Sequence, residues 1–350
     1  MASLKLKFWQ KSSPKNHGDM MADMAGHGAM ALPDISSVPF KWRLKARWEG
    51  YDDPVEYYML QQELDAYRNW LRKMLVYAAR PVEEELPDLD LDDEIGNWPP
   101  ERLKLYAKLF DRGIMKPGGH DYAMELAKPL ALDETMSCLE IGARIGGAAR
   151  LLADKFGVWV TALEQDGELA LIGMDRSVTA GVQKKVPVQK YDPQNPEIRQ
   201  KYFNVVYSVG EMFLIEKKDT FLLQIAESLR EQGQLLLTDY VMTNKSSEQS
   251  DLYKNWLAHE EIMPHPWTAE RYKDVLQKLK FDIRISKDET ALHLSHIKSA
   301  WAGLAQEMKG GEIDPDFNTF LEQELEMWMR RVKLLETGEL AYYRFYATHD

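Results

Sequence analysis

Short apolar runs alternate with segments of helical periodicity from about Met136 to the end of the chain. Such alternation is typical of strands that lie mostly parallel in one sheet, with helices on both faces. The runs that predict strands are MSCLEIG, VWVTALE, VPVQKY, FNVVYSVG, QLLLTDYV, FDIRIS and LAYYRFYA. Because a long helical segment precedes the last run, we expect this strand to return antiparallel. The pattern predicts an α/β fold.

Helical patterning is also clear near the N-terminus. Asp53 can cap a helix and Pro54 suits its first turn. Apolar residues then recur at alternating spacings of three and four up to Ala78, which places them on one stripe. We expect the helix at 54–79 either to pack on its own domain or to join two copies of the chain in a homo-oligomer.

Changes in composition divide the chain into three parts. Residues 1–39 have little periodicity and predict a flexible tail, 40–127 predict a helical extension, and 128–350 predict the α/β domain. Within that domain the segment 241–267 is polar and irregular, and 290–336 is helical with Gly338 after its end. We expect both segments to form a lid or insertion over a pocket.

Composition and charge exclude several classes of protein. The chain has 350 residues, of which 45% are apolar, enough to bury a core without disulfides or metals. A formal net charge of -12 disfavours nucleic acid as a partner. The single cysteine, Cys138, allows no intrachain disulfide, and no apolar run approaches the length of a bilayer span. The N-terminus has no secretory pattern, so we expect a cytoplasmic protein.

The most informative motif is an apolar strand, a glycine-rich turn and a helix between Ser137 and Leu152. Glycines let the backbone approach a ligand, and the helix N-terminus offers free N–H groups. The next predicted strand ends at Glu164, where an acid can accept the ribose hydroxyls of an adenosine cofactor. Glu140 ends the first strand, and a carboxylate there would repel a pyrophosphate. This favours S-adenosyl-L-methionine (SAM), which carries an ammonium, over a dinucleotide.

The run LEIGARIGGAARLLA resembles motif I of the class I SAM-dependent methyltransferases, and it is closest in pattern to those that act on small molecules and lipids. Asp192 fits the acid after strand three that hydrogen-bonds adenine, and FNVVYSVGEMFLI fits the strand-four segment. The resemblance implies a Rossmann-like sheet of seven strands with SAM as cofactor. It implies these cofactor-binding residues: Glu140, Gly142, Arg144, Gly146, Glu164, Asp192 and Ser208.

Arg144 departs from the family pattern, because it replaces the middle glycine of the loop. A side chain there would crowd the methionine end of SAM, point away, or bind its carboxylate. Two functions therefore stay open. The chain is a methyltransferase for a small-molecule or lipid acceptor, or it is a non-catalytic scaffold with a blocked SAM site. A dinucleotide oxidoreductase is a more distant alternative.

The sequence offers several candidate bases for methyl transfer, since a neutral oxygen or carbon acceptor needs one. Glu211 follows strand four, and His259 and His265 lie in the segment 241–267, together with Glu260 and Glu261. Polar residues of an exposed lid would have the same pattern. Aromatic residues that are candidates for an acceptor pocket, or for the core, are Tyr240, Trp256 and Trp267.

Weaker signals lie in the N-terminal part. Met and His residues between His17 and Met30 suit copper(I), but a Met-rich tail explains them better. The basic and aromatic run from Lys41 to Trp48 could contact an anionic membrane, or pair with the acidic stretch at 83–94. That stretch lacks the glycine of a calcium loop, and we predict no metal site.

Overall fold

A computed structural model of the chain describes residues 97–349 except Arg112 and 309–314, together with Val38, Pro39, Arg43, Val55 and Tyr58. The chain divides into two compact units, 1–70 and 71–350, and every element described below belongs to the second. The predicted flexible tail except Val38 and Pro39, the Met/His cluster, the acidic stretch, and all of the 54–79 helix except Val55 and Tyr58 lie outside the described residues.

One sheet of seven strands forms the centre of the fold, in the order β3-β2-β1-β4-β5-β7-β6. Its first five strands are parallel, and β7 is antiparallel to both β5 and β6. The prediction of a mostly parallel Rossmann-like sheet with an antiparallel last strand is therefore confirmed. The strands are β1 (Ser137–Ile141), β2 (Trp159–Glu164), β3 (Val188–Lys190), β4 (Phe203–Val209), β5 (Leu229–Met242), β6 (Phe281–Asp288) and β7 (Leu340–His349).

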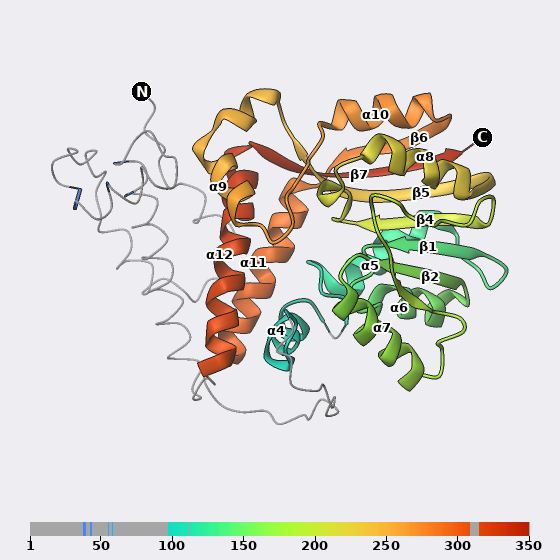
Figure 1. The fold of residues 1–350 in the computed structure, drawn as a ribbon, viewed down its shortest axis with the longest axis horizontal. Coiled ribbons are helices and arrows are strands. Elements are labelled where there is room, and N and C mark those ends of the chain that lie inside the picture. The colour runs from blue at the N-terminus through green and yellow to red at the C-terminus, as the bar shows by residue number, and fades with distance from the viewer. Residues whose placement is uncertain are drawn as a thin grey trace, which may run out of the picture. The chain divides into compact units, whose positions relative to one another are not determined.

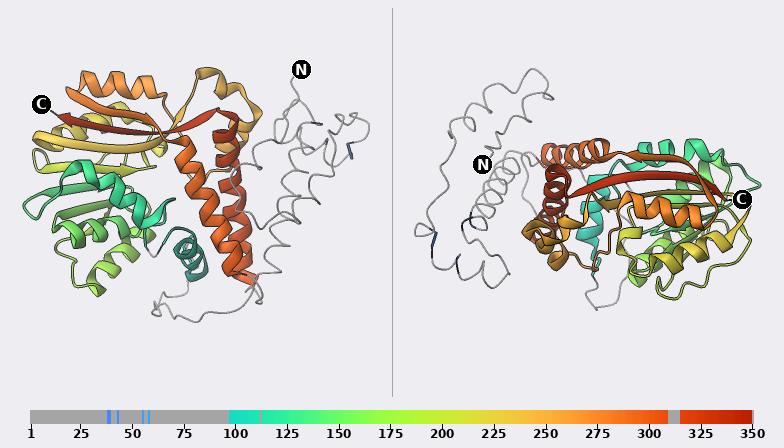
Figure 2. Two further views of the ribbon diagram at one scale, coloured as in Figure 1. Left: turned by 180° about the vertical axis from the view of Figure 1, so that it is seen from behind. Right: turned by 90° about the horizontal axis from the view of Figure 1, so that it is seen from above.

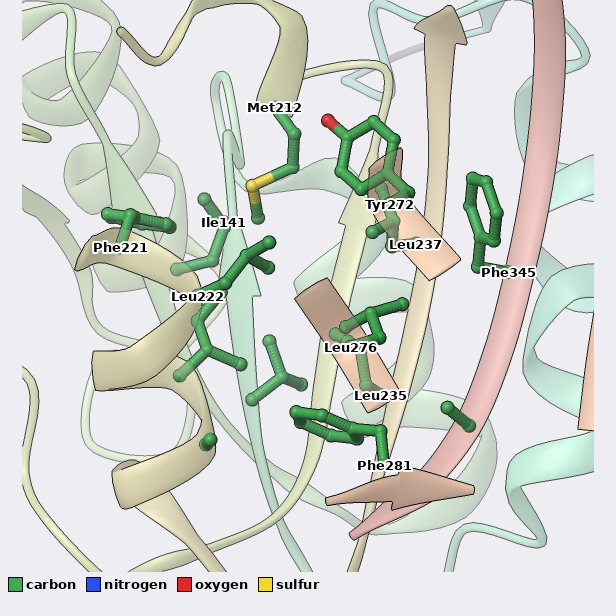
Figure 3. Close-up of a cluster of buried hydrophobic side chains, with 14 of the residues drawn as sticks. Ile141, Met212, Phe221, Leu222, Leu235, Leu237, Tyr272, Leu276, Phe281 and Phe345 are labelled. Carbon is green, nitrogen blue, oxygen red and sulfur yellow. The ribbon is translucent and has the colours of Figure 1, made fainter. Parts of the chain in front are cut away.

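Helices cover both faces of the sheet, as the continuous apolar strands require. On one face α8 (Lys218–Ser228) and α10 (Ala269–Lys278) share a large buried cluster with Leu139 and Ile141 of β1. Figure 3 shows part of this cluster, with Phe221 and Leu222 of α8 on one side, Tyr272 and Leu276 of α10 in the middle, and Phe345 of the last strand on the other side.

On the other face, the second buried cluster gathers around Cys138, which alternates with Leu139 along β1. The helices on this side are α5 (Gly119–Ala127), α6 (Gly147–Phe156) and α7 (Gly167–Thr179). Helix α5 belongs to the segment that we placed in the N-terminal extension, yet Tyr122 and Leu126 pack in the same cluster as α6. The 3-10 turns are η2 (Lys128–Leu130), η3 (Met212–Leu214) and η4 (Lys245–Gln249).

Four further helices gather beyond the carboxyl ends of the parallel strands (Figures 1 and 2). They are α4 (Pro100–Phe110), α9 (Asp251–His259), α11 (Thr290–Glu307) and α12 (Pro315–Thr337). We call them the lid helices. Helix α12 packs on α4, α9 and α11. Gly338 ends α12 with φ +75°, the conformation that its predicted place after the helix requires.

The expectation of an irregular segment at 241–267 is wrong over Asp251–His259, which forms α9. Ser250 caps this helix by accepting a hydrogen bond from the backbone N–H of Tyr253. Tyr253 and Trp256, three residues apart, then bury one face of the helix. The aromatic spacing was the signal for this helix, and the many polar residues around it concealed it.

Candidate active site

The glycine-rich loop connects β1 to α6 at the point where the strand order reverses between β1 and β4. In open α/β sheets, ligands bind at such a point. Gly142 and Gly146 have φ +72° and +70°, and Arg144 adopts φ +53° between them. A side chain in this conformation costs about 1 kcal/mol. Arg144 thus keeps the backbone shape that a glycine would take.

Glu164 at the end of β2 fixes this loop. Its Oε2 accepts a hydrogen bond from the backbone N–H of Arg144 at 2.7 Å, and its Oε1 accepts one from the backbone N–H of Asp166 at 3.0 Å. The carboxylate is fully buried. Burial and the nearby carboxylate of Glu211 raise its pKa. The predicted ribose-binding acid therefore lies directly beside the glycine loop.

Two other predicted residues lie next to the loop: Glu140 near the end of β1, and Glu211 against Gly142. Both are buried, and in each the Oε2 atom has no hydrogen-bond partner among the described residues. Burial raises the pKa of Glu140 to about 7, although Lys116 and Arg150 act to lower it. Glu211 lies over Gly142, where an added Cβ would be 2.3 Å from its Cγ. Only a glycine fits beneath this side chain.

Lys116 is the residue that sequence reasoning missed in this region. Its Nζ donates hydrogen bonds to the carbonyl oxygens of Gly142 at 2.5 Å and Val209 at 2.7 Å. Burial lowers the pKa of Lys116, while Glu211 and Glu140 act to raise it. The only sequence signal was its place in the turn-rich run MKPGGH.

The Arg144 side chain extends from the loop into the adjoining pocket. Burial alone would lower the pKa of Arg144, but Glu211 and Glu164 raise it overall. Within the described part of the chain, no carboxylate oxygen lies within the 4.0 Å of an ion pair with its guanidinium. Arg144 is thus a permanent cation that faces a cavity.

The remaining predicted cofactor residues have local roles in the structure. Asp192 follows β3, is exposed, and accepts a hydrogen bond from the backbone N–H of Gln194. Ser208 is buried in β4 and donates to the carbonyl oxygen of Ile141 in β1 at 3.3 Å. Tyr191, next to Asp192, has a buried hydroxyl without a partner among the described residues.

The pocket lies between the glycine loop and the lid helices and has a volume of about 70 Å³. A site for a drug-sized ligand needs several hundred Å³, so the lid or the side chains must move to admit one. Aromatic and charged residues make up most of its lining. The lining residues are Trp98, Arg102, Tyr106, Met115, Lys116, Pro117, Arg144, Val209, Gly210, Leu214, Tyr240, Glu260, Glu261, Ile262, His293, Met327, Trp328, Arg331 and Tyr342.

A buried pair of polar residues forms part of this lining. The Tyr240 hydroxyl and His293 Nε2 lie 2.8 Å apart, and the imidazole stacks on Tyr342 with the ring centres 3.7 Å apart. Burial lowers the pKa of His293 well below its ordinary value, so the imidazole is neutral. His293 comes from α11, and the helical periodicity of that segment gave no indication that it lines a site.

Of the candidate bases from the segment 241–267, Glu260 and Glu261 line the pocket, whereas the two histidines lie elsewhere. His259 is exposed, and its Nδ1 pairs with the Asn255 carbonyl of its own helix. His265 is half-buried, and neither histidine lines the pocket. Of the three candidate pocket aromatics, Tyr240 lines it, whereas Trp256 stacks on Phe213 and Trp267 packs on Tyr272.

Ion pairs hold the lid helices together around the pocket. Arg102 of α4 pairs with Glu324 of α12 at 2.7 Å, and the Tyr106 hydroxyl donates to the same carboxylate. Arg331 of α12 makes two hydrogen bonds to Glu260, at 2.7 and 2.6 Å. Such buried pairs cost desolvation energy but fix one arrangement of the helices.

Trp98 connects the lid to the sheet. Its indole N–H donates to Asp166 Oδ2 at 2.8 Å, and its backbone N–H donates to Glu168 at 3.2 Å. Asp166 lies two residues after Glu164 and caps α7. The start of α4 therefore lies over the end of β2.

No group of three or more potential metal ligands occurs within the described residues. None of the helices in this part of the chain is long and apolar enough to cross a bilayer.

Comparisons with known proteins agree with this geometry. Residues 115–284 match a family model described as a methyltransferase domain. The chain is 23% identical over 197 residues to the phosphoethanolamine N-methyltransferase of Plasmodium falciparum, covering 56% of this chain and 72% of that protein. It is 26% identical over 161 residues to a sterol 4-C-methyltransferase of Caenorhabditis elegans, covering 45% and 48%.

A solved structure of phosphoethanolamine N-methyltransferase 2 from Haemonchus contortus, in complex with SAM, has a TM-score of 0.61 at 18% identity. The likeness covers 71% of this chain and 56% of that one. The chain spans 48% to 72% of the length of these three relatives. The likeness confirms the fold class predicted from the sequence, and residues 115–284 resemble a methyltransferase domain, in agreement with the predicted family and cofactor.

Proposed function

We propose that the chain transfers a methyl group from SAM to a small-molecule or lipid acceptor that carries an anionic group. The observation that carries the proposal is the pocket that joins the glycine loop to the Tyr240–His293 pair. Arg144 supplies a cation that has no ion-pair partner among the described residues on one wall of this pocket, and the neutral His293 supplies a base on another. An anionic group on the acceptor would pair with Arg144.

The residues of the glycine loop fit the cofactor by charge. SAM, when bound, supplies an activated methyl group on a positively charged sulfur, next to an ammonium. Glu140 and Glu211 each have a buried oxygen without a partner among the described residues, which suits a cationic ligand. Glu164 would hold the ribose hydroxyls, as the family resemblance implies.

The chain's own residues would position the acceptor and remove its proton. The aromatic rings of Tyr240, Tyr342 and Trp328 restrict the acceptor to one part of the pocket, and alignment of donor and acceptor supplies much of the rate. Nε2 of His293 would accept the proton of the Tyr240 hydroxyl as that hydroxyl takes the proton of the acceptor.

The names of the relatives support an acceptor of this class. Two of them act on phosphoethanolamine, a small molecule with a phosphate, and one on a sterol, which is a neutral lipid. The cation in the pocket favours the first kind of acceptor over the second.

The alternative is a non-catalytic scaffold that retains the fold, and one observation favours it. Three side chains, those of Lys116, Arg144 and Glu211, crowd the space around the glycine loop. If these side chains stay in place, the methionine end of SAM cannot enter.

Calorimetric titration with S-adenosylhomocysteine, on the wild type and an Arg144→Gly variant, separates the two functions. Micromolar binding by the wild type would support a donor site and justify a screen of anionic acceptors. No binding by the wild type, with binding restored by Arg144→Gly, would contradict the enzyme proposal and support the scaffold.

Three further expectations accompany the proposal: a cytoplasmic location, contact of the basic N-terminal run with a membrane surface, and a homo-oligomer formed through the 54–79 helix. Co-sedimentation with vesicles of increasing anionic lipid content tests the membrane contact. Light scattering of the full chain and of a variant with polar residues on the apolar stripe of that helix tests the oligomer.

A further inference from the structure

We propose that Lys116 is an internal substitute for the ammonium group of the cofactor, so that Lys116 must leave its place before the amino-acid end of SAM can bind. The inference rests on the proposed function, because it assumes that SAM enters this site.

The geometry of Lys116 is that of a bound ammonium ligand. The carbonyl oxygens of Gly142 and Val209 converge on its Nζ at 2.5 and 2.7 Å. Gly142 follows β1 and Val209 ends β4, so the two carbonyls lie at the point between adjacent strands where ligands bind in open α/β sheets. An ammonium from the cofactor would seek the same two acceptors, and both cannot be held there.

The surrounding charges also suit a replaceable ammonium. Glu140 and Glu211 are the acids that act most strongly on Lys116, and Glu164 contributes as well. Arg144 is the nearby cation that opposes them. An incoming ammonium would keep both carbonyl bonds and the attraction of the acids, so the exchange costs little binding energy at the site itself.

The turn that carries Lys116 has an unusual backbone on both sides. Met115 precedes it with φ +56°, which side chains rarely adopt, and Gly118 and Gly119 follow with φ +89° and +50°. The turn connects α4 of the lid to α5 of the domain. Withdrawal of Lys116 would therefore move the segment that joins the lid to the sheet, and would open the site on that side.

The experiment compares two ligands on the full chain. S-Adenosylhomocysteine has the ammonium, whereas 5′-methylthioadenosine has the same adenosine and thioether without the amino-acid end. Lys116→Met removes the charge and keeps the approximate length. The matched control is Lys104→Met, because Lys104 is an exposed lysine of α4.

We expect Lys116→Met to bind S-adenosylhomocysteine about tenfold or more tightly than the wild type, and 5′-methylthioadenosine within about threefold. Lys104→Met should match the wild type for both ligands. Without ligand, Lys116→Met should melt at a lower temperature, because two buried carbonyls lose their donor. If it does not fold, Lys116→Gln replaces it.

Three results would overturn the inference. Equal or weaker binding of S-adenosylhomocysteine by a folded Lys116 variant would mean that Lys116 does not compete with the cofactor, and the proposed function would stand. An equal gain for both ligands would mean that Lys116 only fills space. No binding of either ligand by the wild type or any variant would remove the proposed function as well.

Discussion

The hydroxyl of Tyr240 and the Nε2 atom of His293 lie 2.8 Å apart, although the first residue comes from β5 and the second from α11. Both line the pocket beside the glycine loop. The pair therefore connects the sheet to the lid helices at the place where an acceptor would be methylated. It is the base that we propose for methyl transfer, and the order of residues along the chain does not indicate it.

Removal of this base should slow methyl transfer without weakening cofactor binding. We expect Tyr240→Phe and His293→Gln each to lower kcat by about a hundredfold, the usual contribution of a general base. The Kd for S-adenosylhomocysteine should change little, because the polar atoms of the pair bond to each other and not to the glycine loop. Steady-state kinetics with calorimetry on the same samples checks both. His259→Gln, at an exposed position, is the control, and an equal loss of activity there would contradict the assignment.

Stability should depend on pH through Glu140. Burial raises the pKa of Glu140 to about 7, so the folded protein holds a proton that the unfolded chain releases at lower pH. The stabilisation is complete below the ordinary glutamate pKa and is lost as the pH rises to about 7, by roughly 3 kcal/mol. Burial also raises the pKa of Asp239 to about 7, so the wild type alone cannot separate the two carboxyl groups. A comparison with a Glu140 variant isolates the contribution of Glu140.

Glu140→Gln should lack this loss. We would measure the free energy of unfolding of both proteins in urea from pH 4.5 to 8. As the pH rises, the value for the wild type should fall relative to that for Glu140→Gln. Glu231→Gln, an exposed substitution, should run parallel to the wild type at every pH. Parallel curves for Glu140→Gln would show that Glu140 stays ionised in the folded protein.

The Arg102–Glu324 pair should contribute more to stability than an exposed pair. Both residues are buried, and Glu324→Ala leaves the Arg102 guanidinium with only the exposed Glu261 as an ion-pair partner among the described residues. The substitution should therefore cost about 3 kcal/mol. Glu307 of α11 makes an exposed ion pair with Lys108 of α4. Glu307→Ala should cost less than about 1 kcal/mol. Urea denaturation measures both, and similar costs would mean that the buried pair is also solvated.

Trp98 should control how fast the cofactor leaves. Trp98→Phe removes the indole N–H that donates to Asp166, and one hydrogen bond is worth about 1 kcal/mol. The dissociation rate of S-adenosylhomocysteine in stopped-flow experiments should therefore rise about fivefold. Trp159→Phe, on a half-exposed tryptophan of β2, should leave this rate unchanged. An unchanged rate in Trp98→Phe would mean that α4 does not have to move.

The sheet could be predicted from the sequence because local patterns determine it. The run LEIGARIGG contains an apolar strand, its glycine turn and the start of a helix, and the structure has β1, Gly142 and α6 in those places. Even the antiparallel return of β7 followed from the long helical segment before it.

The lining of the pocket could not be predicted in the same way. Lys116, His293 and Arg331 come from a turn and two helices that are far apart along the chain, and only the packing of the lid places them together. His259 and His265 were the more obvious candidates because they lie near the strand ends in sequence. Helix α9 directs the first of them to solvent.

The place of β7 has a consequence for the synthesis of the protein. Strand β7 lies between β5 and β6, and it pairs with both along most of its length. While the chain is being made, β6 leaves the ribosome before the strand that must separate it from β5. The completed sheet therefore has to wait for residues 340–349, and until then two unpaired strand edges are exposed to chaperones and to other nascent chains.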